Sequence, residues 1–225
     1  MERIPEPELM DETEQARAYA HADFEAPHSY FIERFVRHFP EGVPGGRVLD
    51  LGCGPGDISM RFARAYPEVQ VDGIDGAGAM LAEGRTLLAQ AGLEGRVSLV
   101  HACLPQDPAP RERYDAIISN SLLHHLYDPQ VLWQAVARYA APGAPVFVMD
   151  LMRPDTPEQA AALVAEHAAG EPEVLRRDFY HSLLAAFTPL EVRAQLAAAG
   201  LQGLSVEAIS DRHLLVHGRL REAGP

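Results

Sequence analysis

Three glycines at alternate positions follow a short apolar run in the segment RVLDLGCGPGD, residues 47–57. The apolar run is typical of a buried strand, and Gly52, Gly54 and Gly56 come directly after it. Glycine has no Cβ atom, so such a turn lets the backbone approach a ligand closely and tolerates positive φ angles. Because ligands bind at the carboxyl ends of strands in α/β sheets, the segment predicts a ligand-binding loop.

The spacing of these glycines bears on the kind of ligand. The dinucleotide-binding pattern is G-x-G-x-x-G, whereas this loop reads G-x-G-x-G and has Asp57 where the third glycine is expected. A carboxylate there would face a pyrophosphate at a helix N-terminus, which favours anions. A zwitterionic or cationic ligand fits better, and a nicotinamide-dependent oxidoreductase remains the less favoured alternative.

A carboxylate ends the next predicted strand. Asp75 closes the segment VQVDGID about twenty residues after the glycine loop. A carboxylate at the tip of a neighbouring strand can accept two hydrogen bonds from a ribose diol. The alternative is that Asp75 only caps a helix that begins near Ala77. With the glycine loop beside it, we favour the ribose interpretation.

Short apolar runs alternate with helical patterns along the chain, which indicates a parallel sheet wrapped by helices. The predicted strands are 47–52, 69–75, 96–102, 114–120 and 144–151, and the helices between them are 57–66, 77–91 and 128–141. Further helices are predicted at 157–169, at 173–186 and after Thr188, which has capping-box spacing to Glu191. Strands 204–210 and 213–220, linked by Asp211 and Arg212, predict an antiparallel hairpin. The expected fold is a Rossmann-like, doubly wound α/β sheet, mostly parallel, with this hairpin and a helical cap.

The two ends of this pattern suggest a division of the chain. Residues 1–44 are expected to form a helical cap over the carboxyl edge of the sheet, with Phe24, Phe31, Phe35 and Phe39 near one side. A packing helix without ligand contacts is the alternative. Residues 45–225 are expected to form the main domain, with a helical insertion at about 152–187 as a possible lid.

Composition excludes some classes of protein. The 225 residues include 19 basic and 32 acidic side chains, so the formal charge is 19 − 32 = −13, which argues against nucleic-acid binding. No apolar run approaches the roughly 18 to 20 residues of a membrane span. Two cysteines, Cys53 and Cys103, fit a reducing compartment, and the acidic N-terminus is not a secretory signal, so a cytoplasmic monomer or homodimer is expected.

Three motifs in order, VLDLGCGPGD, VDGIDGAGAML and YDAIISNSLLHHL, resemble the class I S-adenosylmethionine-dependent methyltransferases over about residues 45–150. The resemblance implies S-adenosylmethionine as cofactor and S-adenosylhomocysteine as product. Cys103 departs from the acidic residue that often binds adenine in this family, so the Leu104 backbone is expected to contribute. The cofactor-binding residues that it implies are Tyr19, Asp50, Gly52, Cys53, Gly54, Gly56, Asp75, Gly76, Met80, Cys103, Leu104, Asn120, Ser121 and His125.

The fourth motif, NSLLHHL, bears on the methyl acceptor. It lacks the prolines and the aromatic residue of the [ND]PP[YF] pattern of enzymes that methylate planar amines, and it is more similar to enzymes acting on small molecules such as quinones, amines or acids. His124 and His125 are the candidate bases, because imidazole titrates near neutrality, and Tyr180 from the insertion is a third catalytic candidate. Both histidines could instead be structural.

No metal site is expected, since an adjacent histidine pair, with Asp128 as the nearest acid, does not supply three convergent ligands. Two functional alternatives stay open. One is a non-catalytic protein that binds the same cofactor, and the other is an enzyme that uses it for a different reaction.

Overall fold

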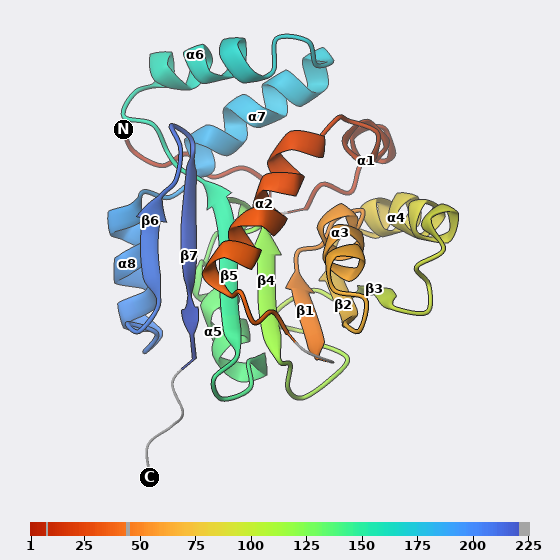
Figure 1. Cartoon of the computed structure of the whole chain (residues 1–225). Coiled ribbons are helices and arrows are strands. Elements are labelled where there is room, and N and C mark those ends of the chain that lie inside the picture. The colour runs from red at the N-terminus through yellow and green to blue at the C-terminus, as the bar shows by residue number, and fades with distance from the viewer. Residues whose placement is uncertain (8, 44–45, 221–225) are drawn as a thin grey trace.

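A computed structural model describes residues 1–7, 9–43 and 46–220. Its centre is a seven-stranded sheet in the order β3-β2-β1-β4-β5-β7-β6, in which β7 runs antiparallel to β5 and β6 and the pairs from β3 to β5 are parallel (Figure 1). The strands are β1 Arg47–Leu51, β2 Gln70–Asp75, β3 Val97–His101, β4 Ala116–Asn120, β5 Pro145–Leu151, β6 Ser205–Ala208 and β7 His213–Arg219. The predicted doubly wound, mostly parallel sheet with a terminal antiparallel pair is confirmed.

Helices cover both faces of this sheet and one of its edges. They are α1 Thr13–Ala20, α2 Glu25–His38, α3 Asp57–Ala65, α4 Gly78–Ala91, α5 Gln130–Tyr139, α6 Pro157–His167, α7 Glu173–Ala185 and α8 Pro189–Ala198, with a short 3₁₀ turn, η1, at Leu123–His125. Helices α2 and α3 lie in front of the sheet in Figure 1, whereas α5 and α8 lie behind it. No helix in the described ranges is long and apolar enough to span a bilayer.

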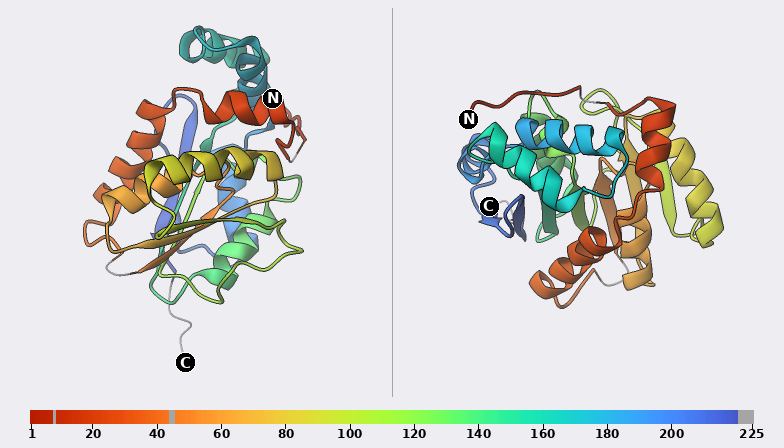
Figure 2. Two further views of the ribbon diagram at one scale, coloured as in Figure 1. Left: turned by 90° about the vertical axis from the view of Figure 1, so that its right-hand side faces the viewer. Right: turned by 90° about the horizontal axis from the view of Figure 1, so that it is seen from above.

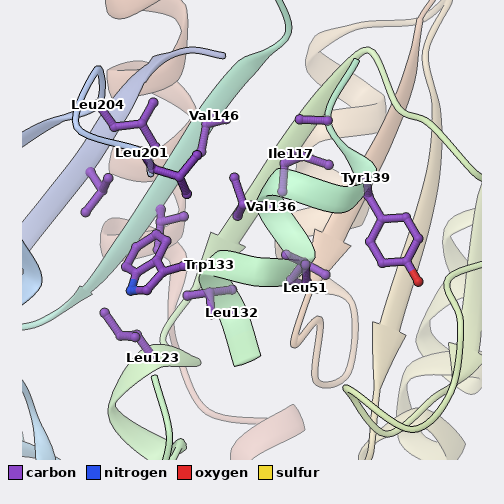
Figure 3. Packing of buried hydrophobic residues seen from close by; sticks show 14 of the residues in the cluster. Leu51, Ile117, Leu123, Leu132, Trp133, Val136, Tyr139, Val146, Leu201 and Leu204 are labelled. Carbon is purple, nitrogen blue, oxygen red and sulfur yellow. The ribbon is translucent and has the colours of Figure 1, made fainter. Parts of the chain in front are cut away.

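Two hydrophobic clusters, one on each face, hold the helices to the sheet. Successive side chains of a strand point to opposite faces, and β5 shows this alternation: Val146 and Val148 join the cluster of α5 and α8, while Phe147 joins that of α2, α3 and α4. Figure 3 shows the first cluster, in which the fully buried Trp133 of α5 packs beside Val136. Its indole nitrogen donates to Gln195 of α8 at 2.9 Å, so the one buried polar atom of the ring is satisfied.

The N-terminal segment differs in part from the expectation. Only α1 lies over the edge of the sheet, where Ala16 packs with Met80 of α4. Helix α2 instead covers a face, because Phe31 and Phe35 are fully buried in the core beside Phe147. The first residues form neither helix nor strand. The predicted boundary between 44 and 45 lies outside the described residues.

The segment after β5 forms a helical pair above the carboxyl ends of the parallel strands (Figure 2). Helices α6 and α7 pack on each other through a small cluster that includes Leu183, Leu184 and Ala160. Helix α8 follows, and its predicted capping box is present: Thr188 accepts from the Glu191 backbone and Glu191 accepts from the Thr188 backbone.

The terminal hairpin has a longer link than expected. The connection spans residues 209–212 rather than only Asp211 and Arg212. Ser210 explains the difference, because its Oγ accepts hydrogen bonds from the backbone nitrogens of Arg212 and His213 and so builds the turn itself.

Candidate active site

The glycine loop lies where the order of the sheet reverses. Strands β1 and β4 are neighbours, and the chain moves to β2 on one side and to β5 on the other, so the site is a topological switch point. Gly52, Gly54 and Gly56 all have positive φ angles, of 71°, 52° and 83°. Only glycine adopts these angles without strain.

Each glycine of the loop has a different surrounding. A Cβ atom would come within 2.7 Å of Leu122 at Gly52 and within 2.9 Å of Leu99 at Gly56, but at Gly54 it would meet nothing within 4 Å. Gly54 therefore faces open space. Gly56 does not line the cavity described below. The structure places the Gly56 Cβ position against Leu99, and a role for Gly56 in cofactor binding stays a prediction.

Asp75 combines both roles weighed for it. Its Oδ2 accepts from the Gly54 nitrogen at 2.8 Å, and its Oδ1 accepts from the Ala77 nitrogen at 2.7 Å, so it ties the glycine loop to the start of α4. Burial raises the pKa of this carboxyl, although the two backbone donors oppose the rise. A carboxylate has about four acceptor positions, so capacity remains for hydroxyl donors from the cavity.

A cavity of about 890 Å³ connects the glycine loop with the helical cap. This volume suits a small ligand together with a cofactor-sized one. Of the residues predicted for the site, those that line it are Tyr19, Asp50, Gly52, Cys53, Gly54, Asp75, Gly76, Met80, Cys103, Leu104, Asn120, Ser121, His124 and His125.

Tyr180 is not among the lining residues. It lies in a shallow outer depression with Arg176 and Arg177, and it packs on the cluster between α6 and α7. The structure therefore places Tyr180 outside this cavity, and a catalytic role for it stays a prediction. Helix α7 turns Phe179 and Ser182 toward the cavity instead, and the 3.6-residue period of the helix leaves Tyr180 on another face.

Buried acids beneath the loop suit a cationic ligand. Asp50 is 1% exposed and accepts a hydrogen bond from Ser59 at 2.6 Å. Burial raises the pKa of Asp50 to about 7, and the hydrogen bond from Ser59 opposes this rise. A positive charge brought into the cavity would favour the ionised form of this carboxyl.

Asp57, which distinguishes this loop from the dinucleotide pattern, has two side-chain partners, an imidazole and a guanidinium. Its Oδ2 lies 2.6 Å from His28 Nδ1 of α2 and 2.6 Å from Arg61 Nε of α3. Burial alone would raise the pKa of Asp57. The hydrogen bonds from His28 and Arg61 outweigh the effect of burial, so the pKa of Asp57 lies below its usual value. The carboxylate thus joins α2 to the start of α3, a role that the sequence did not indicate.

The loop after β4 carries two further signs of a binding site. Ser121 is a non-glycine residue with a positive φ of 58°, a strained conformation that often marks functional loops. The Oδ1 atom of Asn120 is buried and has no hydrogen-bond partner among the described residues. Together with the open face of Gly54, this unpaired acceptor fits a ligand that carries donor groups.

His124 and His125 also line the cavity, from the short turn η1. His124 Nδ1 is 2.6 Å from Asp150 Oδ1, and the Asp150 carboxylate also accepts from the backbone nitrogens of Leu123 and Leu151. Burial alone would lower the pKa of His124. The charge of Asp150 outweighs the effect of burial, so the pKa of His124 lies above its usual value. Burial lowers the pKa of His125, and the neighbouring His124 lowers it further. The pKa values of the two adjacent imidazole rings are therefore shifted in opposite directions.

Sequence reasoning missed the contacts that the N-terminal segment makes with His125 and with α7. Glu6 Oε1 lies 3.3 Å from His125 Nδ1 and accepts from Ser182 Oγ of α7 at 2.9 Å. Gln15 of α1 donates to Asp178 of α7 at 2.7 Å. No local pattern indicates contacts between residues so far apart, although Asp150, at the end of a predicted strand, carried a positional signal.

The comparisons with known proteins agree with this geometry. Residues 48–143 match the family model described as "Methyltransferase domain". The chain is 37% identical over 125 residues to trans-aconitate 2-methyltransferase of Variovorax paradoxus, covering 56% of this chain and 45% of the relative. It is 33% identical over 112 residues to the ubiquinone/menaquinone biosynthesis C-methyltransferase UbiE of Syntrophotalea carbinolica, covering 50% and 46%. This chain thus spans less than half the length of these curated relatives.

A solved structure extends the likeness to the fold of the whole chain. The SAM-dependent methyltransferase from Aquifex aeolicus superimposes with a TM-score of 0.66 at 18% identity, covering 93% of this chain and 98% of that one. Residues 48–143 are therefore similar to a methyltransferase domain, and the solved structure shows the same fold, so the resemblance seen in the sequence is confirmed.

Proposed function

We propose that this chain transfers the methyl group of S-adenosylmethionine to a small-molecule acceptor. The observation that carries the proposal is that one cavity is lined by the glycine loop and Asp75 together with His124 and His125. When bound, the cofactor supplies an electrophilic methyl group on a sulfonium. The chain itself has to bind the cofactor and the acceptor, orient them for transfer, and exclude water from the cavity.

The residues at the loop end fit this cofactor. Gly54 offers an open backbone face, Asp75 retains acceptor capacity for ribose hydroxyls, and Asn120 Oδ1 needs a donor. The buried carboxyl of Asp50 would favour the positively charged cofactor over a pyrophosphate. Met80, Cys103 and Leu104 supply apolar walls suited to a flat base.

The cap favours a small acceptor. Gln15 of α1 bonds to Asp178 of α7 above the cavity, so a polymer would have to displace this bridge. The formal charge of −13 adds repulsion against a phosphate backbone. The names of the two curated relatives, which refer to trans-aconitate and to quinone biosynthesis, support a small molecule. We propose that residues 152–187, together with the N-terminal segment, act as the lid.

Calorimetric titration with S-adenosylmethionine, S-adenosylhomocysteine and NAD tests the cofactor assignment. Binding of the first two without NAD is expected. Binding of NAD alone would restore the oxidoreductase alternative and overturn the proposal.

A panel of small acids, phenols, quinols and amines, followed by detection of S-adenosylhomocysteine, tests transfer. Turnover that depends on one acceptor supports an enzyme. Tight cofactor binding with no turnover on any acceptor would favour the non-catalytic alternative.

A further inference from the structure

Three potential metal-ligating atoms converge beside the cavity. Glu6 Oε1 lies 3.7 Å from His124 Nε2 and 3.3 Å from His125 Nδ1, and all three atoms lie within 4.8 Å of one another. Ligands of a tetrahedral zinc ion, with bonds of about 2.0–2.1 Å, are about 3.3 Å apart. The spacing is therefore close to that of a metal site before any adjustment of side chains.

The second nitrogen of each ring already has a partner, so the converging nitrogen is the one available to a metal ion. His124 Nδ1 bonds to Asp150, whose carboxylate is held by two backbone donors and so accepts the ring proton. The Pro7 backbone hydrogen-bonds the ring of His125, whose Nδ1 is buried and without a hydrogen-bond partner in the described part of the chain. Metal-binding histidines show this arrangement, with an outer carboxylate or carbonyl fixing the tautomer.

Among the described residues, no arginine side chain is hydrogen-bonded to the three converging atoms. The guanidinium of Arg3 is close, but its hydrogen bonds go to the carbonyl oxygens of Ala185, His124 and Leu126. The side chains of Glu6 and His125 are each only 12% exposed, and that of His124 is 3% exposed. A cation between these atoms would contact one carboxylate oxygen and two ring nitrogens in a site that is largely shielded from water.

We propose that Glu6, His124 and His125 bind a divalent first-row transition metal ion, zinc in the first instance. Two histidines and one carboxylate form a known ligand set for zinc sites that keep a position open for water or substrate. His124 and His125 line the cavity, so the open position would face it. Metal binding itself does not depend on the proposed function.

One consequence does rest on the proposed function. An acceptor oxygen bound at the open position would be polarised and oriented by the metal ion. His124 Nε2 would then be a ligand rather than the base that the sequence suggested. The preferred acceptor would be a hydroxyl or carboxyl compound, which can offer such an oxygen.

Two other clusters of similar composition serve as internal controls. In Glu166, His167 and Asp211, the side chain of Arg212 already occupies the cation position, 2.8 Å from both His167 Nε2 and Asp211 Oδ1. This cluster is also exposed. In His38, Glu207 and His217, the Nε2 of His217 is 2.9 Å from Glu207 Oε1, so that nitrogen is engaged in a hydrogen bond.

The test is a zinc titration of full-length protein that has been stripped with a chelator. Calorimetry gives stoichiometry and affinity, and the visible spectrum of the Co²⁺-substituted protein reports coordination geometry. We expect one equivalent per chain, loss of tight binding in Glu6→Gln and in His125→Asn, and unchanged binding in His167→Asn. Asp150→Asn retains all three ligands and should weaken binding by roughly 10- to 100-fold.

Several outcomes would overturn the site. They are no binding by the wild-type chain, unchanged affinity in both Glu6→Gln and His125→Asn, or an equal loss in His167→Asn. Thermal melts verify that each variant is folded, and two independent ligand variants keep the test decisive if one is not. Titration with S-adenosylhomocysteine on the same samples separates failure of the metal site from failure of the proposed function.

Discussion

At the scale of single residues, Asp75 is the group whose loss should affect cofactor binding most directly. Asp75→Ala removes the acceptor of two proposed hydrogen bonds from ribose, and it also releases the Gly54 backbone that Asp75 holds at 2.8 Å. We expect binding of S-adenosylhomocysteine to weaken by about 1 to 3 kcal/mol, measured by calorimetry. An unchanged affinity in a folded variant would refute the ribose assignment.

Gly54 offers a steric test of the same end of the cavity. A valine there would place its side chain in the open space that the Gly54 Cβ position faces, at a φ of 52° that a β-branched residue resists. We expect Gly54→Val to abolish cofactor binding in the same calorimetric assay. Gly143→Val is the matched control, since Gly143 also has a positive φ and free space around its Cβ position but lies outside the cavity.

Asp50 predicts a pH dependence. Burial raises the pKa of Asp50 to about 7 in the structure without ligand, and a bound cation would lower it. Binding therefore favours the deprotonated carboxyl, so affinity should rise as the pH increases toward 7 and level off above it, with release of a proton.

Calorimetry in two buffers of different ionisation enthalpy counts the protons released near pH 6. Asp50→Asn should bind without this release. Equal proton release by the variant and by the wild type would show that another group titrates.

At the scale of elements, helix α2 tests whether the N-terminal segment belongs to the core. Phe35 is fully buried and lies against Phe62 and Phe147, whereas the adjacent Val36 is 45% exposed. We expect Phe35→Ala to lower the free energy of unfolding by about 3 to 5 kcal/mol. Val36→Ala, the control on the same helix, should stay within about 0.5 kcal/mol. Urea denaturation measures both changes. If both variants lowered the free energy of unfolding by a similarly small amount, α2 would not be part of the core.

Elements were also where the sequence was most informative. Each predicted strand exists within two residues of its expected ends, because short runs rich in Val, Ile and Leu between helical patterns leave few alternatives. The residues at the carboxyl ends of the strands were informative too. Gly52, Asp75 and Asn120 lie at the carboxyl ends of the neighbouring strands β1, β2 and β4, and all three line the cavity. The orientation of Tyr180 could not be predicted in this way, because the face that a residue occupies on α7 depends on how the whole helix packs.

Long-range side-chain contacts were beyond such reasoning. Glu6 lies in a stretch without helix or strand, and nothing local pairs it with His125 or Ser182. The expectation that no metal site exists rested on Asp128 as the nearest acid in sequence, whereas the structure brings a carboxylate from 118 positions away, 124 − 6 = 118. Convergence of this kind is a property of tertiary structure.

At the scale of the whole molecule, two segments far apart in the sequence, α1 and α7, meet above the cavity. Gln15 and Asp178 link α1 to α7, and Tyr19, Phe179 and Ser182 line the space below. We expect S-adenosylhomocysteine to slow amide hydrogen exchange in residues 13–20 and in 173–185 together. Gln15→Ala should lessen the slowing in both segments. Protection of only one segment would contradict a jointly closing lid.

The contacts of Arg3 set an order of events during synthesis of the chain. Its guanidinium bonds to Ala185, 182 positions later, and lies 4.0 Å from the ring of Phe187. Arg3 therefore leaves the ribosome long before its partners do, and contacts of such high sequence separation form late. A nascent chain halted before α7 would already contain β1 to β5, while the segment around Arg3 would still lack these partners and be open to proteases.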